Sequence, residues 1–476
     1  MQAGVAVSRG PFSVSAPARF TILAAMHHSE DAPVPPPIDG LTVHRLTVHG
    51  DNRGWFKENW AGTPALRVEQ NNVSFNAQKG ATRGMHAEPW DKYVSVATGR
   101  VFGAWVDMRD GSPTYGEKFG CEIGPDTAVF VPRGVANGFQ ALEDGTTYIY
   151  LCNARWSPDA SYAFCSFKEI EWPLEPTEVS PKDLAHPPLI DASPVPPRRT
   201  LVTGADGQLG RALRALLPDA DFCGHSDFDL TWPVETMMEA RDWAQYSSII
   251  NAAAFNDVNG AETAEGRTAA WQVNALGPAK LAQVANRYDL TLVNVSTDYV
   301  FDGTVAEHTE GEVPSPLGVY GASKSAGEAA AAAAEKHYIV RTSWVFGDGG
   351  NFMATMARLA REGVSPKVVN DQRGRPTWAE DLAKGIVHLI DTGAEYGIYN
   401  ITSSGDTASR DEIAMAVYVA AGADPADVHP VSSTEYQAEF GPEAPRPAES
   451  TLALDKIEAA GFTPTNWRVA LALYLG

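Results

Sequence analysis

The hydrophobic pattern of the chain changes at about residue 200, and this change constrains the fold more than any other feature. From Gly40 to Trp172, short apolar segments are broken by Gly, Pro, Asp and Asn, with almost no helical periodicity. Strands at such regular spacing predict an all-β sandwich or barrel. After residue 200, strand-like and helix-like segments alternate, as in "TLVTGA", "GRALRALL" and "SSIINAAA". This alternation predicts an α/β domain with a doubly wound parallel sheet.

A proline-rich stretch separates the two patterns. "EPTEVSPKDLAHPPLIDASPVPPRRT" spans residues 175–200, and its composition predicts an interdomain linker. The N-terminal residues lack a convincing signal-peptide layout, and we interpret them as disordered or as lying upstream of an initiator at Met26. We therefore predict four parts, which are a disordered extension (1–38), a β domain (39–185), a linker (186–198) and an α/β domain (199–476).

Composition and charge narrow the class of protein. A content of 44% hydrophobic and 20% charged residues is ordinary for a soluble globular protein. The formal net charge of −22 argues against nucleic-acid or anionic-membrane partners, and no apolar run approaches membrane-spanning length. The four cysteines show no CxxC spacing, which suits reduced thiols in the cytosol rather than disulfides or a zinc site. We predict a cytoplasmic protein with no metal, no nucleic-acid partner and no membrane association.

The segment "GADGQLG" (204–210) carries three glycines, each three residues from the next, after an apolar run. Gly204 would tighten the turn, Gly207 would let backbone approach a pyrophosphate, and Gly210 would let a helix pack on the strand. Alone this is weak evidence, since a plain strand-to-helix turn has a similar sequence. Asp227 and Asp229 lie about twenty residues further on, where an acid commonly meets adenosine hydroxyls.

Two later segments, "NVSTDYVFDG" (294–303) and "YGASKSAGE" (320–328), predict a hydride-transfer site. Tyr320 and Lys324 are four residues apart and therefore share one face of a helix. A lysine ammonium beside a phenol lowers the pKa of the phenol from about 10 toward the working pH. Tyr320 would then protonate a carbonyl oxygen as hydride arrives at the carbon. Thr297 ends a predicted strand and would donate a second hydrogen bond to that oxygen.

Residues 199–476 resemble the extended short-chain dehydrogenase/reductase family, with its Rossmann-type fold, and within it the dTDP-4-dehydrorhamnose reductases. Further matching segments are "INAAAF", "RTSWVFG", "NDQRGRPT" and a late "RP". The resemblance implies NADPH or NADH as cofactor and a dTDP-linked nucleotide sugar as substrate. It implies that Thr297, Asp298, Tyr299 and Trp344 face the sugar. It also implies that the cofactor is lined by Gly204, Gly207, Gln208, Leu209, Gly210, Asp229, Leu230, Ala252, Ala253, Val295, Tyr320 and Lys324.

The sequence leaves the choice between the two cofactors open. Arg211 lies within the first predicted helix, and no basic cluster follows the second predicted strand. The chain also reads "AAFNDVNGAE" where the family often has a charged pair, so that Asn259 and Gly260 are expected to affect local packing or cofactor contacts.

The first half resembles the dTDP-4-dehydrorhamnose 3,5-epimerase family, a cupin-type β-jelly-roll that works without metal. The matching segments are "DNRGWFKENW" (51–60), "QNNVSFNAQKGATRGMHAEPWDKYVSV" (70–96), "VDMRDGSPTYG" (106–116) and "VPRGVANGFQAL" (131–142). The resemblance implies that His86 is the base, Lys92 stabilises the enolate and Tyr150 returns the proton, as this chemistry requires. It also implies nucleotide binding by Arg53, Glu58 and Arg83, and a homodimer through the β domain.

Two positions depart from the epimerase pattern. Asn137 stands where the family usually has a site histidine, and the shortened segment "CSFKEIEWP" holds no aspartate to orient His86, with only Glu169 or Glu171 nearby. An unpartnered histidine loses tautomer control, which costs orders of magnitude in rate. Three hypotheses therefore stay open. They are a bifunctional epimerase and reductase, a reductase with a β domain that only binds or dimerises, and a nucleotide-sensing regulator without catalysis.

Overall fold

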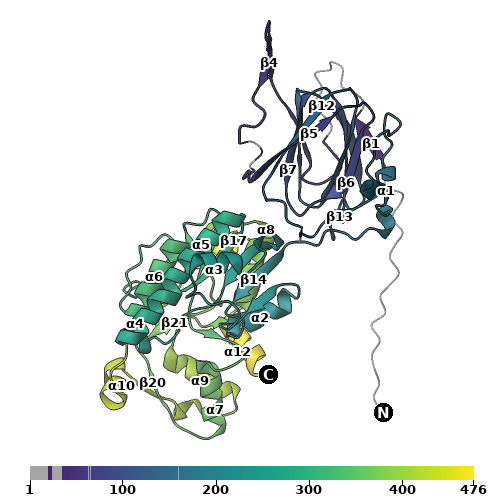
Figure 1. Cartoon of the computed structure of the whole chain (residues 1–476). Helices are drawn as coiled ribbons and strands as arrows, with labels where there is room; N and C mark the ends of the chain where they lie inside the picture. The colour runs from purple at the N-terminus through teal and green to yellow at the C-terminus, as the bar shows by residue number, and fades with distance from the viewer. Residues whose placement is uncertain (1–19, 24–34, 63, 65, 159) are drawn as a thin grey trace, which may run out of the picture. The chain divides into compact units, whose positions relative to one another are not determined.

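The computed structural model describes residues 20–23, 35–62, 64, 66–158 and 160–476, and the chain divides into two compact units, Met1–Pro197 and Arg198–Gly476 (Figure 1). The predicted linker is wrong in extent. Val195 is buried, and its N–H donates to the Met108 carbonyl at 2.7 Å. Most of residues 186–197 therefore packs on the first unit, because apolar side chains between the prolines fill its surface.

The prediction of a disordered N-terminal extension is corrected where the structure describes it. Phe20–Leu23 forms strand β1, which pairs in parallel with strand β9. Ile38 is 1% exposed and packs in the core of the first unit. Residues 1–19 and 24–34 of the extension, including Met26, lie outside the described residues.

The first unit consists of two β-sheets and a hairpin. One sheet has the order β1-β9-β8-β11-β6-β13, the other has the order β2-β10-β7-β12-β5, and β3 pairs with β4. The elements are β1 (Phe20–Leu23), β2 (Thr42–Arg45), β3 (Val48–Asp51), β4 (Gly54–Lys57), β5 (Gln70–Asn76), β6 (Thr82–Ala87), β7 (Lys92–Thr98), β8 (Val101–Asp107), β9 (Lys118–Ile123), β10 (Thr127–Val131), β11 (Val135–Ala141), β12 (Thr146–Cys152), β13 (Ala163–Phe164) and helix α1 (Pro181–Leu184). This architecture agrees with the predicted all-β fold.

Strand β8 explains how the first sheet is covered on both faces. Successive side chains of a strand point to opposite faces, and Trp105 packs with the second sheet while Ala104 and Val106 pack on the other side. Ile170 and Val195 cover that outer side. The chain after β13 is thus held against the first sheet, and this packing brings α1 beside β6.

The second unit contains a sheet of six parallel strands in the order β15-β14-β16-β17-β18-β23. These strands are β14 (Arg199–Thr203), β15 (Asp221–Cys223), β16 (Tyr246–Asn251), β17 (Thr291–Thr297), β18 (His337–Thr342) and β23 (Gly397–Asn400). The strand order reverses at β14, which lies between β15 and β16. Open parallel sheets bind ligands beyond the carboxyl ends of their strands at such a switch point.

Helices cover both faces of this sheet, as the doubly wound prediction requires. Ile249 packs with α5 on one face, and its neighbour Ile250 packs with α2 and α8 on the other. The helices are α2 (Gln208–Leu216), α3 (Val234–Glu239), α4 (Ala264–Ala270), α5 (Gly277–Tyr288), α6 (Val319–Ala331), α7 (Phe352–Arg361), α8 (Ala379–Thr392), α9 (Arg410–Ala420), α10 (Ser433–Phe440), α11 (Asp455–Ala459) and α12 (Trp467–Leu475). Short strands complete the unit, at β19 (Val345–Phe346), β20 (Lys367–Val369), β21 (Arg373–Gly374), β22 (Thr377–Trp378), β24 (Ala408–Ser409) and β25 (His429–Val431).

A second core joins α7, α9 and α12 into a smaller lobe of this unit. Among the described residues, none of the helices combines the length and apolarity that a membrane span needs.

Candidate active sites

The glycine-rich loop after β14 has the geometry of a dinucleotide cradle. Gly204 has φ +71°, and a Cβ there would lie 2.6 Å from the Ala252 carbonyl carbon. A Cβ on Gly210 would lie 2.4 Å from the Gly204 oxygen, so α2 packs directly on the loop. At Gly207 a Cβ would meet only the Gly204 oxygen, at 3.3 Å, and no side chain caps α2 in the described chain. The first N–H groups of α2 are therefore free to receive a phosphate, and the loop fits the pyrophosphate of NADH or NADPH.

The other predicted cofactor residues lie around this loop with different exposures. Asp229 accepts the Thr231 N–H at 2.8 Å and lies 3.4 Å from the exposed ring of His225. Leu230 is buried in the core, so its side chain contributes packing. The remaining predicted residues are partly or fully buried at the carboxyl ends of the strands or in the first turn of α2, namely Gln208, Leu209, Ala252, Ala253 and Val295.

Tyr320 and Lys324 lie in the first turns of α6, beside the end of β17. The Tyr320 hydroxyl hydrogen-bonds Thr297, and its ring meets that of Tyr299 edge-on at 5.6 Å. The Lys324 ammonium donates to the Val295 carbonyl at 2.5 Å. The structure thus brings together the groups that the sequence predicted to act on one carbonyl oxygen.

The predicted direction of the Tyr320 pKa is wrong. Burial raises the pKa of Tyr320, and the charge of Asp298 raises it further, against the lowering effect of the Thr297 hydrogen bond. Burial also lowers the pKa of Lys324 to about 8, opposed by the charge of Glu328. Desolvation disfavours the charged form of both groups and is the largest cause of both shifts. Tyr320 is therefore a protonated phenol at neutral pH, which is the form that donates a proton.

Two arginines that the sequence reasoning did not assign border the predicted sugar side. The Nε atoms of Arg410 and Arg446 are buried and have no hydrogen-bond partner within the described chain. The guanidinium of Arg410 lies 4.5 Å from the Trp344 ring, and Trp344 itself has φ +44°. Left-handed backbone in a non-glycine residue is strained and concentrates at functional sites. The late "RP" segment of the sequence contains Arg446 and could have indicated it as a site residue. No local sequence pattern indicated Arg410.

Asn259 has a packing role at this edge of the unit. Its Oδ1 accepts the Ala444 N–H at 3.0 Å, and Ala444 directly precedes the Pro445–Arg446 segment. The departure from the charged family pair therefore affects local packing, one of the two effects expected from the sequence.

Replacing Asp298 by asparagine is expected to stabilise the protein above pH 6 and to have little effect near pH 4. Burial raises the pKa of Asp298 to about 6. A carboxyl group with a raised pKa binds its proton more tightly in the folded state, so the free energy of unfolding falls as pH rises from about 4 to 6. A shift of this size corresponds to about 2–3 kcal/mol. Denaturant unfolding of the D298N variant at pH 7.5 and 4.5 measures this gain.

The matched control is D302N on the same segment. Hydrogen bonds from Thr304 lower the pKa of Asp302, so its replacement is expected to give no gain at pH 7.5. If D298N raised the free energy of unfolding equally at both pH values, the ionised carboxylate of Asp298 would not be the destabilising group.

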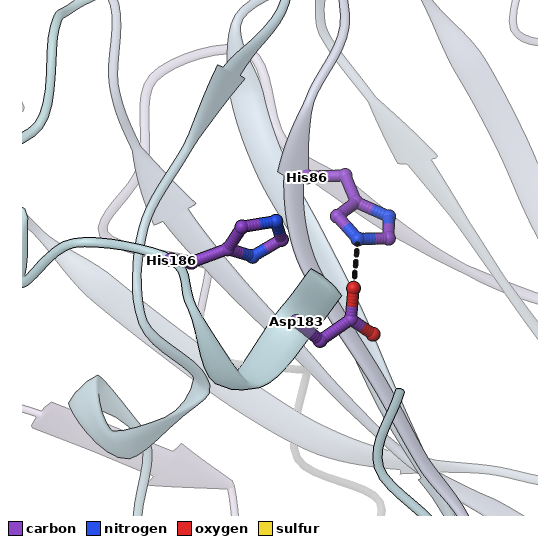
Figure 2. Close-up of side chains that lie close together, drawn as sticks. All are labelled: His86, Asp183 and His186. Carbon is purple, nitrogen blue, oxygen red and sulfur yellow. Dashed lines mark hydrogen bonds and ion pairs between the residues drawn. The ribbon is translucent and has the colours of Figure 1, made fainter. Parts of the chain in front are cut away.

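His86 has an aspartate partner in the first unit. Its Nε2 lies 2.9 Å from Oδ1 of Asp183, which sits on α1, while His86 itself projects from β6 (Figure 2). The second carboxylate oxygen of Asp183 accepts the Gly84 N–H at 3.2 Å, and the Ser180 side chain caps α1. Burial raises the pKa of Asp183, but its bond to His86 and their opposite charges outweigh this effect and lower the pKa overall.

The expectation that His86 lacks an orienting aspartate is therefore wrong. Neither glutamate considered in its place reaches the histidine. Glu169 is held by the Lys118 ammonium at 2.7 Å and by the Leu189 N–H at 2.9 Å, and Glu171 is exposed. The partner comes instead from the proline-rich segment, because that segment folds back onto the first sheet.

A cavity of about 940 Å³ opens beside this pair, a volume that suits a nucleotide-sugar ligand. His86 and Tyr150 both line it, together with Arg83, whose Nε donates to Asn76 at 3.1 Å. Burial raises the pKa of Tyr150, so its hydroxyl stays protonated. The further lining residues are Ala81, Thr82, Glu88, Trp156, Pro158, Tyr162, Phe164, Glu178, Val179, Ser180, Pro181, Lys182 and Asp183.

Lys92 lies behind this wall rather than on it. Its ammonium is buried and paired with Glu88, and it sits 5.5 Å from the centre of the Tyr150 ring. Asn137 pairs in register with His86 across strands β11 and β6, and its Oδ1 accepts a hydrogen bond from the Tyr148 hydroxyl at 3.3 Å. Asn137 is thus engaged in the core beside the site.

The structure does not bring Arg53 and Glu58 to this cavity. Arg53 lies in the turn of the β3–β4 hairpin, where its guanidinium pairs with Asp51 and is 85% exposed. Glu58 follows β4 and is also exposed. Both residues belong to the segment from β3 to Glu58, which we call the β3–β4 arm. Within the described part of the first unit, neither residue lines the cavity.

His186 is a third polar group at the His86–Asp183 pair (Figure 2). Its ring stacks on Phe164 at 4.7 Å and meets the His86 ring edge-on at 5.4 Å. Burial lowers the pKa of His186, and the neighbouring His86 lowers it further. One ligand atom from each of His86, Asp183 and His186 lies within 4.8 Å of the others, so this group has the composition of a metal-binding set.

Comparisons with known proteins match each half of the chain separately. The family described as "RmlD substrate binding domain" matches residues 198–476, and the family described as "dTDP-4-dehydrorhamnose 3,5-epimerase" matches residues 35–191. A dTDP-4-dehydrorhamnose reductase of Mycobacterium tuberculosis is 40% identical over 290 residues, which cover 58% of this chain and 92% of that protein. A protein from Streptococcus pyogenes named as an RmlC homolog is 46% identical over 180 residues, covering 34% of this chain and 90% of that protein.

A solved structure supports the same assignment of the second unit. A dTDP-4-dehydrorhamnose reductase from Bacillus anthracis, in complex with NADP, is 34% identical and has a TM-score of 0.54. The match covers 58% of this chain and 98% of that chain. These findings confirm both resemblances that the motifs predicted.

Proposed function

The chain belongs to the family of the RmlD substrate binding domain, and a dTDP-4-dehydrorhamnose 3,5-epimerase unit precedes that domain in the sequence. From the presence of both units we propose that one polypeptide performs two successive reactions. The two units are a dTDP-4-dehydrorhamnose 3,5-epimerase and an NAD(P)H-dependent dTDP-4-dehydrorhamnose reductase of dTDP-L-rhamnose biosynthesis. The first unit makes the ketosugar that the second unit reduces.

In the epimerase unit, His86 removes a proton from a carbon next to the C4 ketone. Asp183 accepts the hydrogen bond of one ring nitrogen and so leaves the other nitrogen free to act as the base. Tyr150, a protonated phenol on the wall of the same cavity, returns a proton from its own side. Lys92 lies behind the cavity wall, paired with Glu88 and 5.5 Å from the centre of the Tyr150 ring, so in this proposal it acts through these two lining residues and not by direct contact with the enolate.

In the reductase unit, Tyr320 donates its proton to the C4 oxygen while Thr297 hydrogen-bonds the same group. The nicotinamide cofactor, when bound, supplies the hydride. Lys324 lies one helical turn after Tyr320, and its ammonium donates to the Val295 carbonyl. Arg410 and Arg446 have buried donors without partners, and these suit the anionic diphosphate of the substrate.

The His86–Asp183 pair is the observation that favours two activities over a reductase with a silent β domain. A non-catalytic module needs no buried carboxylate aimed at a histidine on the wall of a cavity. A regulator without catalysis would not need the groups that act on a carbonyl oxygen. The second unit has these groups, at Thr297, Tyr320 and Lys324, which argues against that hypothesis.

The test is a single-enzyme assay with dTDP-4-dehydro-6-deoxyglucose and NADPH or NADH, without added epimerase. Formation of dTDP-L-rhamnose by the full chain is the expected result, with loss in the H86A variant and recovery when a separate epimerase is added. Turnover only in the presence of added epimerase would leave the reductase and remove the first activity.

We further propose a homodimer through the β domain. The β3–β4 arm exposes Trp55 and Phe56, and Val73 and Phe75 are each 63% exposed on β5, the edge strand of its sheet. Large apolar side chains on an edge strand are a ready pairing surface. A second copy that covers this surface would explain why Arg53 stands on an arm away from the cavity of its own unit.

Mixing two inactive variants is expected to restore epimerase activity if the arm of one protomer serves the cavity of its partner. R53A removes the arm contact, and H86A removes the base. A dimer formed from one copy of each has one cavity with both functions, so the mixture should regain roughly a quarter of wild-type activity, the statistical yield for random C2 pairing. The two variants are mixed and left to exchange subunits. Light scattering then checks that the protein is dimeric, and an epimerase assay measures the recovered activity. No recovery in a mixture that contains mixed dimers would show that Arg53 serves its own protomer.

We also propose a cytoplasmic location. All four cysteines are free and buried, as expected of thiols that stay reduced.

A further inference from the structure

We infer that the reductase unit of this chain binds NADH in preference to NADPH, because two carboxylates converge where the 2′ position of the adenosine ribose is received. The inference rests on the proposed reductase function and concerns only the choice between its two cofactors.

The place is the carboxyl end of β15, directly beside the glycine-rich loop. β15 ends at Cys223, and the Ala205 N–H donates to the Cys223 carbonyl at 3.2 Å. The loop and the residues after β15 therefore run side by side. In dinucleotide-binding folds of this kind, a carboxylate after the second strand binds the ribose 2′-hydroxyl, whereas an arginine there accommodates a 2′-phosphate.

Two acidic groups from different segments border Gly224 at this point. A Cβ built on Gly224 would lie 2.7 Å from Oδ2 of Asp206, which belongs to the glycine-rich loop. It would lie 3.6 Å from Oδ2 of Asp227, the same oxygen that accepts the Gly224 N–H at 3.2 Å. Gly224 thus leaves open a small corner whose walls are carboxylate oxygens.

The chemistry of these walls distinguishes the two cofactors. A carboxylate accepts a hydrogen bond from a ribose hydroxyl. A 2′-phosphate brings further negative charge within a few ångström of Asp206 and Asp227, and like charges at that distance repel each other even near the protein surface. Because both carboxylates are exposed, the repulsion is also sensitive to salt.

Three basic side chains near this corner already make other contacts. The Nε of Arg211 lies 3.2 Å from the Asp348 carboxylate. Arg241 donates to the backbone carbonyl of Asp227 at 3.3 Å. His225 is paired with an aspartate at 3.4 Å. Each of these three side chains would therefore have to give up a present contact to bind a phosphate.

The test is the dissociation constant of each reduced cofactor for the full chain, measured by isothermal titration calorimetry. NADH is expected to bind at least about tenfold more tightly than NADPH, a difference of about 1.4 kcal/mol. The D206N variant is expected to narrow this ratio from both sides, because it strengthens NADPH binding by removing a negative charge and weakens NADH binding by replacing a carboxylate acceptor with a weaker amide acceptor. Added salt is expected to narrow the ratio in the wild-type chain.

The control variant is D391N, which makes the same change of charge at an exposed residue at the end of α8 and should leave the ratio unchanged. Equal or tighter NADPH binding by the wild-type chain would overturn the inference, and so would an unchanged ratio in D206N. A selective loss of NADPH affinity in R241Q would also overturn it, since the guanidinium would then be the phosphate ligand. Binding of neither cofactor would instead contradict the reductase function itself.

Discussion

Replacing Asp183 by asparagine is expected to lower the epimerase turnover number by about 10³- to 10⁴-fold, while the reductase keeps its wild-type rate. The carboxylate holds His86 through a 2.9 Å contact to Nε2 and requires the proton on that nitrogen. An asparagine amide can donate to the ring and favour the opposite tautomer, which removes the base. Incorporation of solvent deuterium at C3 and C5 of the ketosugar measures the first activity, and cofactor oxidation with pre-epimerised substrate measures the second.

The matched control for this variant is E171Q. Glu171 is exposed and belongs to the segment in which the sequence pattern placed the orienting acid. Its replacement is expected to change the epimerase rate less than about twofold, as for most surface substitutions. Combining H86N with D183N should be scarcely worse than H86N alone, because the two residues act as one unit. A D183N variant within tenfold of wild type, together with a slow E171Q variant, would reverse the assignment.

Replacing Tyr320 by phenylalanine is expected to lower the reductase turnover number by about 10²- to 10⁴-fold, the usual effect of losing a general acid. Burial raises the pKa of this phenol, so in the wild-type chain it carries the proton throughout the neutral range. Cofactor affinity should change little, since the substitution removes a single oxygen. Stopped-flow oxidation of the reduced cofactor and titration calorimetry measure the two quantities separately.

The control is Y396F, at a partly exposed tyrosine elsewhere in the same unit. The pH profile adds a second readout. Burial lowers the pKa of Lys324 to about 8, so the positive charge beside the phenol is lost above that pH and turnover is expected to decline there. A Y320F variant that keeps more than about a tenth of wild-type turnover would mean that another group supplies the proton.

Most of the reductase half could be predicted because its signals are local. Gly204 and Gly210 lie where any Cβ would strike backbone within 3 Å, so the spacing of the loop reports its geometry directly. Tyr320 and Lys324 share a helix face by their spacing alone. The pKa of Tyr320 could not be predicted in this way, because it depends on burial and on the charge of Asp298, and both come from the packed structure.

The sequence by itself determined the two fold classes, the order of the units and the chemical groups at the reductase site, because these depend on periodicity and on residues close together in the chain. Only the tertiary structure decided the partner of His86. Asp183 is 97 residues away, in a proline-rich stretch that carries every local signal of a linker. Its role arises because the apolar residues around it, such as Ile170 and Val195, pack on the first sheet and set α1 against β6. A long-range pair of this kind is selected by the burial of its neighbours, and no spacing along the chain encodes it.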